Sequence, residues 1–176
     1  MPDIHILTGP PGSGKSGVLE QFAPHSRIVA EPARTVLAAQ RASGGRGTGD
    51  QDPALFVALM LKQALRDQQA LRGASGPVIC DRSLPDLLAY TAYWQLPDGA
   101  IRTAIAAMPS PQTVFWFPSW RAIYTQDEER TLDFDGSAAF GALVRTAYES
   151  LGLALVEMPL APVTDRAAFI RQRIGA

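Results

Sequence analysis

The chain has 176 residues, of which 47% are hydrophobic, so it is long enough to bury a substantial core. Its formal charge of −1 provides no basic excess for nucleic acid, and its single cysteine, Cys80, excludes an internal disulfide. The longest apolar run, residues 54–61, is far shorter than a membrane-spanning helix, and no basic region precedes the first apolar segment as in a secretion signal. We therefore expect a cytoplasmic protein with one domain over residues 1–176, which binds neither nucleic acid nor membranes.

Five short apolar segments have the composition of strands: 4–7, 27–30, 77–80, 113–117 and 153–158. Most are unbroken apolar runs, which are typical of a parallel sheet buried on both faces. Helical patterns lie between them, at 15–22, about 53–72, 83–94, 137–152 and 164–175. The alternation predicts an α/β fold with right-handed crossovers.

Several residues mark the helix ends. Asp52 followed by Pro53 predicts a helix start, and Ser83 with Asp86 predicts a capping box. Ser137 is the expected N-cap of the next helix. The glycine-rich stretch 42–53 favours a flexible surface loop, with a mobile flap over a substrate as the alternative.

The segment GPPGSGKSG follows the first strand and precedes a helix, and it fits the phosphate-binding P-loop pattern in full. Its glycines let consecutive backbone N–H groups point inward at phosphate oxygens, and the following helix adds the positive end of its dipole. Lys15 supplies a charge at the outer phosphates, and the Ser16 hydroxyl suits Mg²⁺. We expect ATP and Mg²⁺ as cofactors. The expected nucleotide-binding residues are Gly9, Pro10, Pro11, Gly12, Ser13, Gly14, Lys15, Ser16 and Gly17.

Asp81 ends the third strand, at the sheet edge where parallel α/β folds bind ligands. A carboxylate there can reach Mg²⁺, so Ser16 and Asp81 are the candidate metal ligands. The next residue is Arg82, where a motor ATPase usually carries a water-orienting Glu. Arginine binds phosphate but is a poor base, which favours group transfer over dedicated hydrolysis.

Glu31 ends the second strand and lies at the same edge, where Pro32 turns the chain. Its carboxylate could accept the proton of an acceptor hydroxyl during phosphoryl transfer. Arg34 could hold a substrate or pair with Glu31. A solvent-facing Glu at a strand end is the alternative.

A polar, charged segment at about 119–135 follows the fourth strand and contains Arg121 and Arg130. We interpret it as a small lid whose arginines close on the transferring phosphoryl group, with Arg130 the stronger candidate. A solvated charged turn is the alternative. The candidate catalytic residues are thus Lys15, Glu31, Asp81, Arg82 and Arg130.

Four stretches together resemble two related groups: GPPGSGKS, EPAR after the second strand, DRSLPDLLAY after the third, and DEER before a long helix. One group is the deoxynucleoside kinases. The other is a family of small AAA-like P-loop NTPases allied to the ribosylnicotinamide kinase domain. The resemblance implies a three-layer P-loop NTPase sandwich with a five-stranded parallel sheet of order 2-3-1-4-5, and the site roles given above.

The expected function is Mg²⁺-dependent transfer of the γ-phosphoryl group of ATP to an unidentified small-molecule hydroxyl, with a nucleoside-like acceptor possible. Two alternatives stay open: a nucleotide-dependent regulatory module without a small-molecule acceptor, and a slow hydrolase. The sequence does not decide between ATP and GTP, nor does it give the oligomeric state.

Overall fold

The computed structural model describes residues 3–24, 26–125 and 132–175. Five parallel strands form one sheet in the order β2-β3-β1-β4-β5, which confirms the expected topology. The strands are β1 (Asp3–Thr8), β2 (Arg27–Val29), β3 (Pro77–Asp81), β4 (Thr113–Trp116) and β5 (Leu155–Glu157). In the register of the central strands, Ile6 of β1 lies opposite Cys80 on one side and Val114 on the other.

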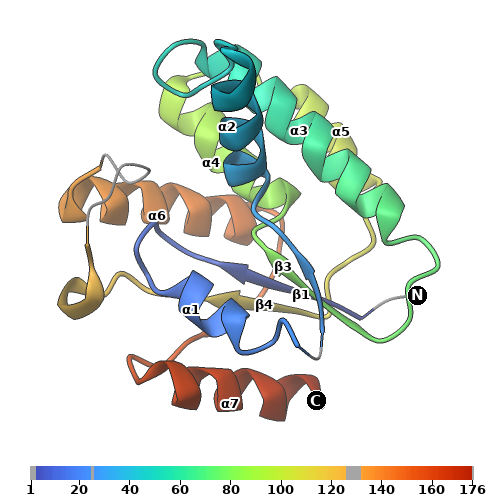
Figure 1. Cartoon of the computed structure of the whole chain (residues 1–176), viewed down its shortest axis with the longest axis vertical. Helices are drawn as coiled ribbons and strands as arrows, with labels where there is room; N and C mark the ends of the chain where they lie inside the picture. The colour runs from blue at the N-terminus through green and yellow to red at the C-terminus, as the bar shows by residue number, and fades with distance from the viewer. Residues whose placement is uncertain (1–2, 25, 126–131, 176) are drawn as a thin grey trace.

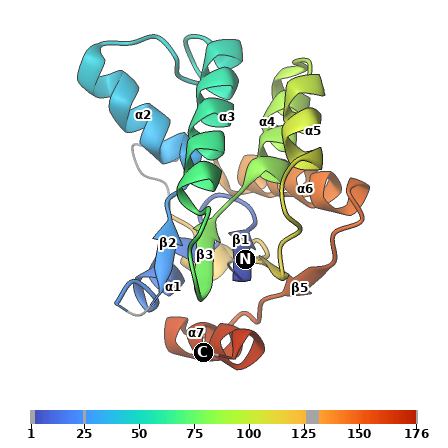
Figure 2. The same ribbon diagram turned by 90° about the vertical axis from the view of Figure 1, so that its right-hand side faces the viewer.

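Helices cover both faces of this sheet (Figures 1 and 2). α1 and α7 lie on one face, while α4 and α6 lie on the other, with α2, α3 and α5 stacked beyond the sheet. The helices are α1 (Lys15–Glu20), α2 (Pro32–Ser43), α3 (Pro53–Ala70), α4 (Leu84–Trp94), α5 (Gly99–Ala106), α6 (Phe134–Ser150) and α7 (Val163–Ile174), with a 3₁₀ turn η1 (Arg121–Ile123). None of the helices in the described part of the chain combines the length and hydropathy that a bilayer crossing demands.

Alternate residues of the strands supply the two sides of the core. Ile6 and its neighbours Val78 and Val114 pack against α4 and α6, whereas Leu7 packs with Ile79 and Phe115 toward α1 and α7. All of these side chains are at most 2% exposed, and full burial of one such side chain stabilises the fold by about 1.5–3 kcal/mol. The unbroken apolar runs in the sequence reflect this burial on both faces.

The helix boundaries confirm some predictions and correct others. The Asp52 side chain caps α3 by accepting from the Leu55 N–H, and Ser83 with Asp86 forms the expected capping box of α4. The prediction that Ser137 is an N-cap is wrong, because α6 begins three residues earlier behind Asp133, which accepts from the Gly136 N–H. Two helices, α2 and α5, were not anticipated from the sequence.

The fold brings three candidate segments to one edge of the sheet. The P-loop follows β1, Glu31 follows β2, and Asp81 is the last residue of β3. Because β2, β3 and β1 are adjacent and parallel, their carboxyl ends meet at the same edge. This edge is where a ligand crevice is expected.

Candidate active site

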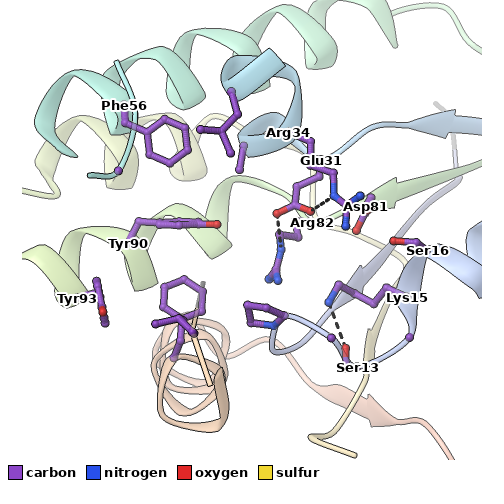
Figure 3. A pocket seen from close by; sticks show the side chains of 18 of the residues that line it. Ser13, Lys15, Ser16, Glu31, Arg34, Phe56, Asp81, Arg82, Tyr90 and Tyr93 are labelled. Carbon is purple, nitrogen blue, oxygen red and sulfur yellow. Dashed lines mark hydrogen bonds and ion pairs between the residues drawn. The ribbon is translucent and has the colours of Figure 1, made fainter. Parts of the chain in front are cut away.

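A cavity of about 660 Å³ opens at this edge of the sheet. Its lining comes from five regions: the P-loop with the start of α1, the ends of β2 and β3, the helices α2, α3, α4 and α6, the loop between α2 and α3, and the two described ends of the segment at about 119–135 (Figure 3). The volume is within the usual range for small-molecule sites, about 300–1,000 Å³. Within it the structure brings together Lys15, Ser16, Glu31, Asp81 and Arg82, which the sequence had singled out separately.

The P-loop owes its curled backbone to glycine. Gly14 has φ 84°, a conformation that disfavours any side chain, and a Cβ there would lie 2.7 Å from Nη1 of Arg166. Arg166 comes from α7 and donates from Nη1 to the Ser13 carbonyl at 3.2 Å. On the opposite side of the loop, the Ser137 hydroxyl donates to the Pro11 carbonyl at 2.7 Å. The loop is therefore fixed from both layers of helices before any ligand binds.

Lys15 lies buried at the centre of the loop. Its ammonium donates to the carbonyls of Gly9 at 3.2 Å and Pro10 at 2.9 Å, and to the Ser13 hydroxyl at 3.2 Å. Burial, and next the nearby guanidinium of Arg82, lower the pKa of Lys15 to about 7. A polyanionic ligand would oppose both effects and favour the charged ammonium.

Glu31 lies between two guanidinium groups (Figure 3). Oε1 accepts from Nε of Arg82 at 3.0 Å, and Oε2 accepts from Nε of Arg34 at 3.2 Å. Burial alone would raise the pKa of Glu31, but Arg82, Lys15 and Arg34 outweigh it and hold this pKa below its ordinary value. The carboxylate is therefore ionised at neutral pH and is largely shielded from bulk water.

Asp81 has the opposite electrostatic character. It is 7% exposed, and its Oδ1 is buried without a hydrogen-bond partner among the described residues. Burial, and next the repulsion of Glu31, raise the pKa of Asp81 to about 6. This unpartnered carboxylate oxygen lines the same cavity as the Ser16 hydroxyl. Together the two oxygen atoms are ligands of the kind that Mg²⁺ prefers. Among the described residues, no three or more His, Cys, Asp or Glu side chains are grouped so that they could hold a metal ion.

The other end of the cavity is lined by aromatic rings. Tyr90 stacks on Trp94 with ring centres 5.6 Å apart, and it also contacts Phe140 at 4.9 Å and Phe56 at 6.2 Å. Figure 3 shows the Tyr90 hydroxyl pointing in the direction of Glu31 and Arg82. The cavity thus combines a charged end at the P-loop with an end lined by aromatic rings, which suits a ring-containing ligand.

The glycine-rich loop at 44–52 borders the aromatic end. Gln40 anchors it by accepting from the Gly47 N–H at 2.9 Å. Gly49 lies so close to Trp94 that a Cβ would be 2.9 Å from the indole ring, and both Gly49 and Asp50 line the cavity. The loop is therefore packed against the cavity and is not free in solvent, while its motion as a flap over a substrate stays a prediction.

The expected lid is described only at its two ends. Arg121 pairs with Asp135 at 2.9 Å, and the Tyr124 hydroxyl donates to the Leu132 carbonyl, so the ends are held together. Ile123 and Leu132 line the cavity. Arg130 lies outside the described residues, so its expected role stays a prediction.

Sequence reasoning missed the aromatic lining and the bracing role of Arg166. The aromatic residues sit on α3, α4 and α6, and only the packing of these helices shows that they share one cavity. Arg166 is 4% exposed, and burial lowers its pKa below the ordinary value. The available signal in the sequence is spacing, because Arg166 precedes Ile170 by four positions and so falls on the same face of a helix as that apolar side chain.

Most of the chain matches a known protein family. Residues 4–166 match the family model described as an AAA domain. The chain belongs to this AAA domain family. The match covers the P-loop, Glu31, Asp81, Arg82 and the whole aromatic cavity. Among curated protein sequences, no significant match is found.

Solved structures share the fold of this AAA domain. The NadR protein in complex with NR aligns with a TM-score of 0.76 and 16% identity over 99% of this chain, which spans 52% of the NadR chain. Deoxyadenosine kinase from M. mycoides with bound dATP aligns with a TM-score of 0.69 and 12% identity, covering 98% of this chain and 99% of the kinase. NadR with NAD and AMP-PNP gives a TM-score of 0.71. At such identities the likeness establishes the P-loop NTPase fold alone, and the chain spans about half the length of NadR.

Proposed function

We propose that this AAA domain protein is a P-loop kinase that transfers the γ-phosphoryl group of ATP to a hydroxyl of a small, ring-containing acceptor. The observation that carries the proposal is the layout of the cavity. The ionised Glu31 and the guanidinium of Arg82 lie beside Lys15, and the same cavity continues into the aromatic end. A hydrolase needs a water-orienting group but has no use for a second, ring-sized compartment.

The chain's own residues supply the parts that phosphoryl transfer requires. The P-loop amides and Lys15 would hold the β- and γ-phosphates. Glu31 would accept the proton of the acceptor hydroxyl. The hydroxyl oxygen of the acceptor would form a bond to the γ-phosphorus, while the bond between the γ-phosphorus and the bridging oxygen of ADP breaks. Arg82 would orient Glu31 and offset negative charge at the reacting centre. Ser16 and Asp81 would hold Mg²⁺, which when bound neutralises phosphate charge.

Relatives of similar fold support a ring-containing acceptor. Deoxyadenosine kinase is described with bound dATP and, in a second structure, with the product dCMP. NadR is described in complex with NR. These ligands belong to those proteins, and for this chain they define which compounds to test first: nucleosides and nucleoside-like compounds with a free hydroxyl.

The test measures ADP formation from Mg-ATP with a panel of nucleosides and other small hydroxyl compounds. We expect one class of compound to stimulate ADP formation and to appear in phosphorylated form. Glu31→Gln should lower this transfer at least roughly tenfold while leaving ATP affinity unchanged. The control Glu149→Gln makes the same chemical change at an exposed position of α6 that does not line the cavity, and it should keep full activity.

Two outcomes would count against the proposal. Equal transfer by Glu31→Gln and the parent protein would remove the base assignment. Tight ATP binding without stimulation by any compound would favour a nucleotide-dependent binding module instead of a kinase.

A further inference from the structure

Asp86 is a carboxylate that the proposed reaction does not yet use, although it lies close behind the reacting groups. It is fully buried in the first turn of α4 and accepts four hydrogen bonds. Oδ1 accepts from the Thr8 hydroxyl at 2.6 Å and from Nη1 of Arg82 at 2.8 Å. Oδ2 accepts from the Ser83 N–H at 3.0 Å and from the Tyr148 hydroxyl at 2.6 Å.

Helix capping explains only one of these four bonds. A capping box needs the bond from the Ser83 N–H alone, and exposed carboxylates serve that purpose well. Here the side chain is withdrawn from solvent, which is unfavourable for a carboxylate unless a cation and several donors compensate. β1 supplies Thr8, α6 supplies Tyr148, and the turn after β3 supplies Arg82, so three separate elements converge on Asp86.

Arg82 links Asp86 to the site. Its backbone has φ 64°, unusual for a residue other than glycine, and its N–H donates to the Leu7 carbonyl at 2.9 Å. The guanidinium is 4% exposed and bridges two carboxylates, with Nε on Glu31 and Nη1 on Asp86. Burial would lower the pKa of Arg82, but these two carboxylates outweigh it and raise this pKa. The cation is thus permanently charged and shared.

We propose that Asp86 is a positioning residue, which fixes Arg82 from behind and offsets part of its positive charge, so that Arg82 weakens the basicity of Glu31 less than it otherwise would. The expected effect on phosphoryl transfer rests on the proposed kinase function. The expected effect on the charge of Glu31 does not, because it requires no substrate. Asp86 itself does not line the cavity and would not touch the substrate.

The groups that face Glu31 set the expected direction. They are Lys15 from α1, Arg34 from α2, Asp81 and Arg82 at the end of β3, and Tyr90 from α4. In an Asp86→Asn variant all of them remain, and only the second anion on Arg82 is lost. Since a nearby negative charge raises the pKa of a carboxyl group, its loss should lower the pKa of Glu31. Because the guanidinium group of Arg82 separates the two carboxylates, we expect the loss of the Asp86 charge to lower the pKa of Glu31 by about one unit.

The test is a titration of the full chain labelled with ¹³C at the glutamate carboxyl groups. Glu31→Gln identifies the Glu31 signal by its absence. We expect the pKa of Glu31 to fall by about one unit in Asp86→Asn. The matched control is Tyr148→Phe, which removes one hydrogen bond to Asp86 but keeps its charge, and which should leave the pKa of Glu31 unchanged. An unchanged pKa in a folded Asp86→Asn protein, or an equal fall in both variants, overturns the proposal.

A second measurement covers the case in which Asp86→Asn does not fold. In a Glu31→Ala variant labelled with ¹⁵N-arginine, Asp86 alone should still hold Arg82 through Nη1. Arg82 should then keep separate Nη1 and Nη2 signals, because the ion pair prevents rotation of the guanidinium group. A single averaged signal, like that expected of the exposed Arg27, would show that Asp86 does not hold Arg82 and would overturn the proposal.

These readouts distinguish failure of this inference from failure of the proposed function. The pKa shift requires neither ATP nor an acceptor, so it can be present in a protein that transfers nothing. Where transfer is found, Asp86→Asn should lower kcat with little change in ATP affinity. The acidic limb of the pH profile of kcat should also move to lower pH, together with the pKa of Glu31.

Discussion

At the scale of single residues, Lys15 gives the site a charge that depends on the ligand. Burial and Arg82 lower its pKa to about 7, which predicts that a neutral Lys15 becomes populated in the nucleotide-free protein at pH 8. Binding of a triphosphate favours the ammonium form and raises this pKa again. Mg-ATP binding at pH 8 should therefore take up to about one proton from the buffer, and the uptake should fade well below pH 7 because Lys15 is already charged there.

Calorimetry in buffers with different ionisation enthalpies measures this uptake. The binding enthalpy at pH 8 should vary linearly with the buffer's ionisation enthalpy, in the direction of proton uptake. Lys15→Arg is the control because arginine stays charged when buried, so its binding enthalpy should show no buffer dependence. A buffer-independent enthalpy in the parent protein would contradict the depressed pKa of Lys15.

The site residues divide according to whether local sequence marks them. That Lys15, Glu31 and Asp81 line one cavity could be predicted, because a motif or a strand end specifies the place of each and parallel strands bring such ends together. Their roles in binding and catalysis stay predictions. The contact of Tyr148 with Asp86 spans 62 positions of the chain, and that of Arg166 with Ser13 spans 153. Such contacts depend on how helices pack on the sheet, which no local pattern encodes.

At the scale of elements, the loop at 44–52 forms a wall of the aromatic end and has little free space. A Cβ on Gly49 would approach the indole of Trp94 to 2.9 Å and would require the ring or the loop to move. Gly49→Ala should therefore destabilise the protein by about 1–3 kcal/mol, the usual effect of overpacking. Urea denaturation followed by tryptophan fluorescence measures this change.

Gly99→Ala is the matched control for this loop. Gly99 begins α5 and has open space around its Cβ position, so alanine should be neutral or stabilise the helix by up to about 1 kcal/mol. If Gly49→Ala is as stable as Gly99→Ala, the loop does not pack tightly on Trp94 and does not form a fixed wall of the aromatic end.

The elements themselves were predictable to different degrees. All five strands could be predicted, since an apolar run between turn residues is a strong signal over a few residues. α2 was missed because Pro32 was interpreted only as a strand breaker, although proline is equally suited to the first turn of a helix. α5 has eight residues and buries only Ile101 within its own length, so its periodicity is weak.

At the scale of the whole molecule, the cavity is a product of the complete fold. β1 and α1 provide the P-loop, β2 and β3 provide Glu31 and Asp81, and helices from the outer layer provide the aromatic end. No segment contains the site by itself. A ligand that fills the cavity therefore stabilises contacts between all layers and should oppose global unfolding.

Thermal unfolding with a non-hydrolysable ATP analogue and Mg²⁺ tests this linkage. A ligand at about 100 times its Kd adds about 2.7 kcal/mol to the free energy of unfolding, which for a chain of this size raises Tm by roughly 5–10 °C. Lys15→Ala should remain folded but show no such rise, because it lacks the charge at the phosphates. If Tm rises equally in both proteins, the nucleotide binds outside the P-loop, and the cavity described here is not the nucleotide site.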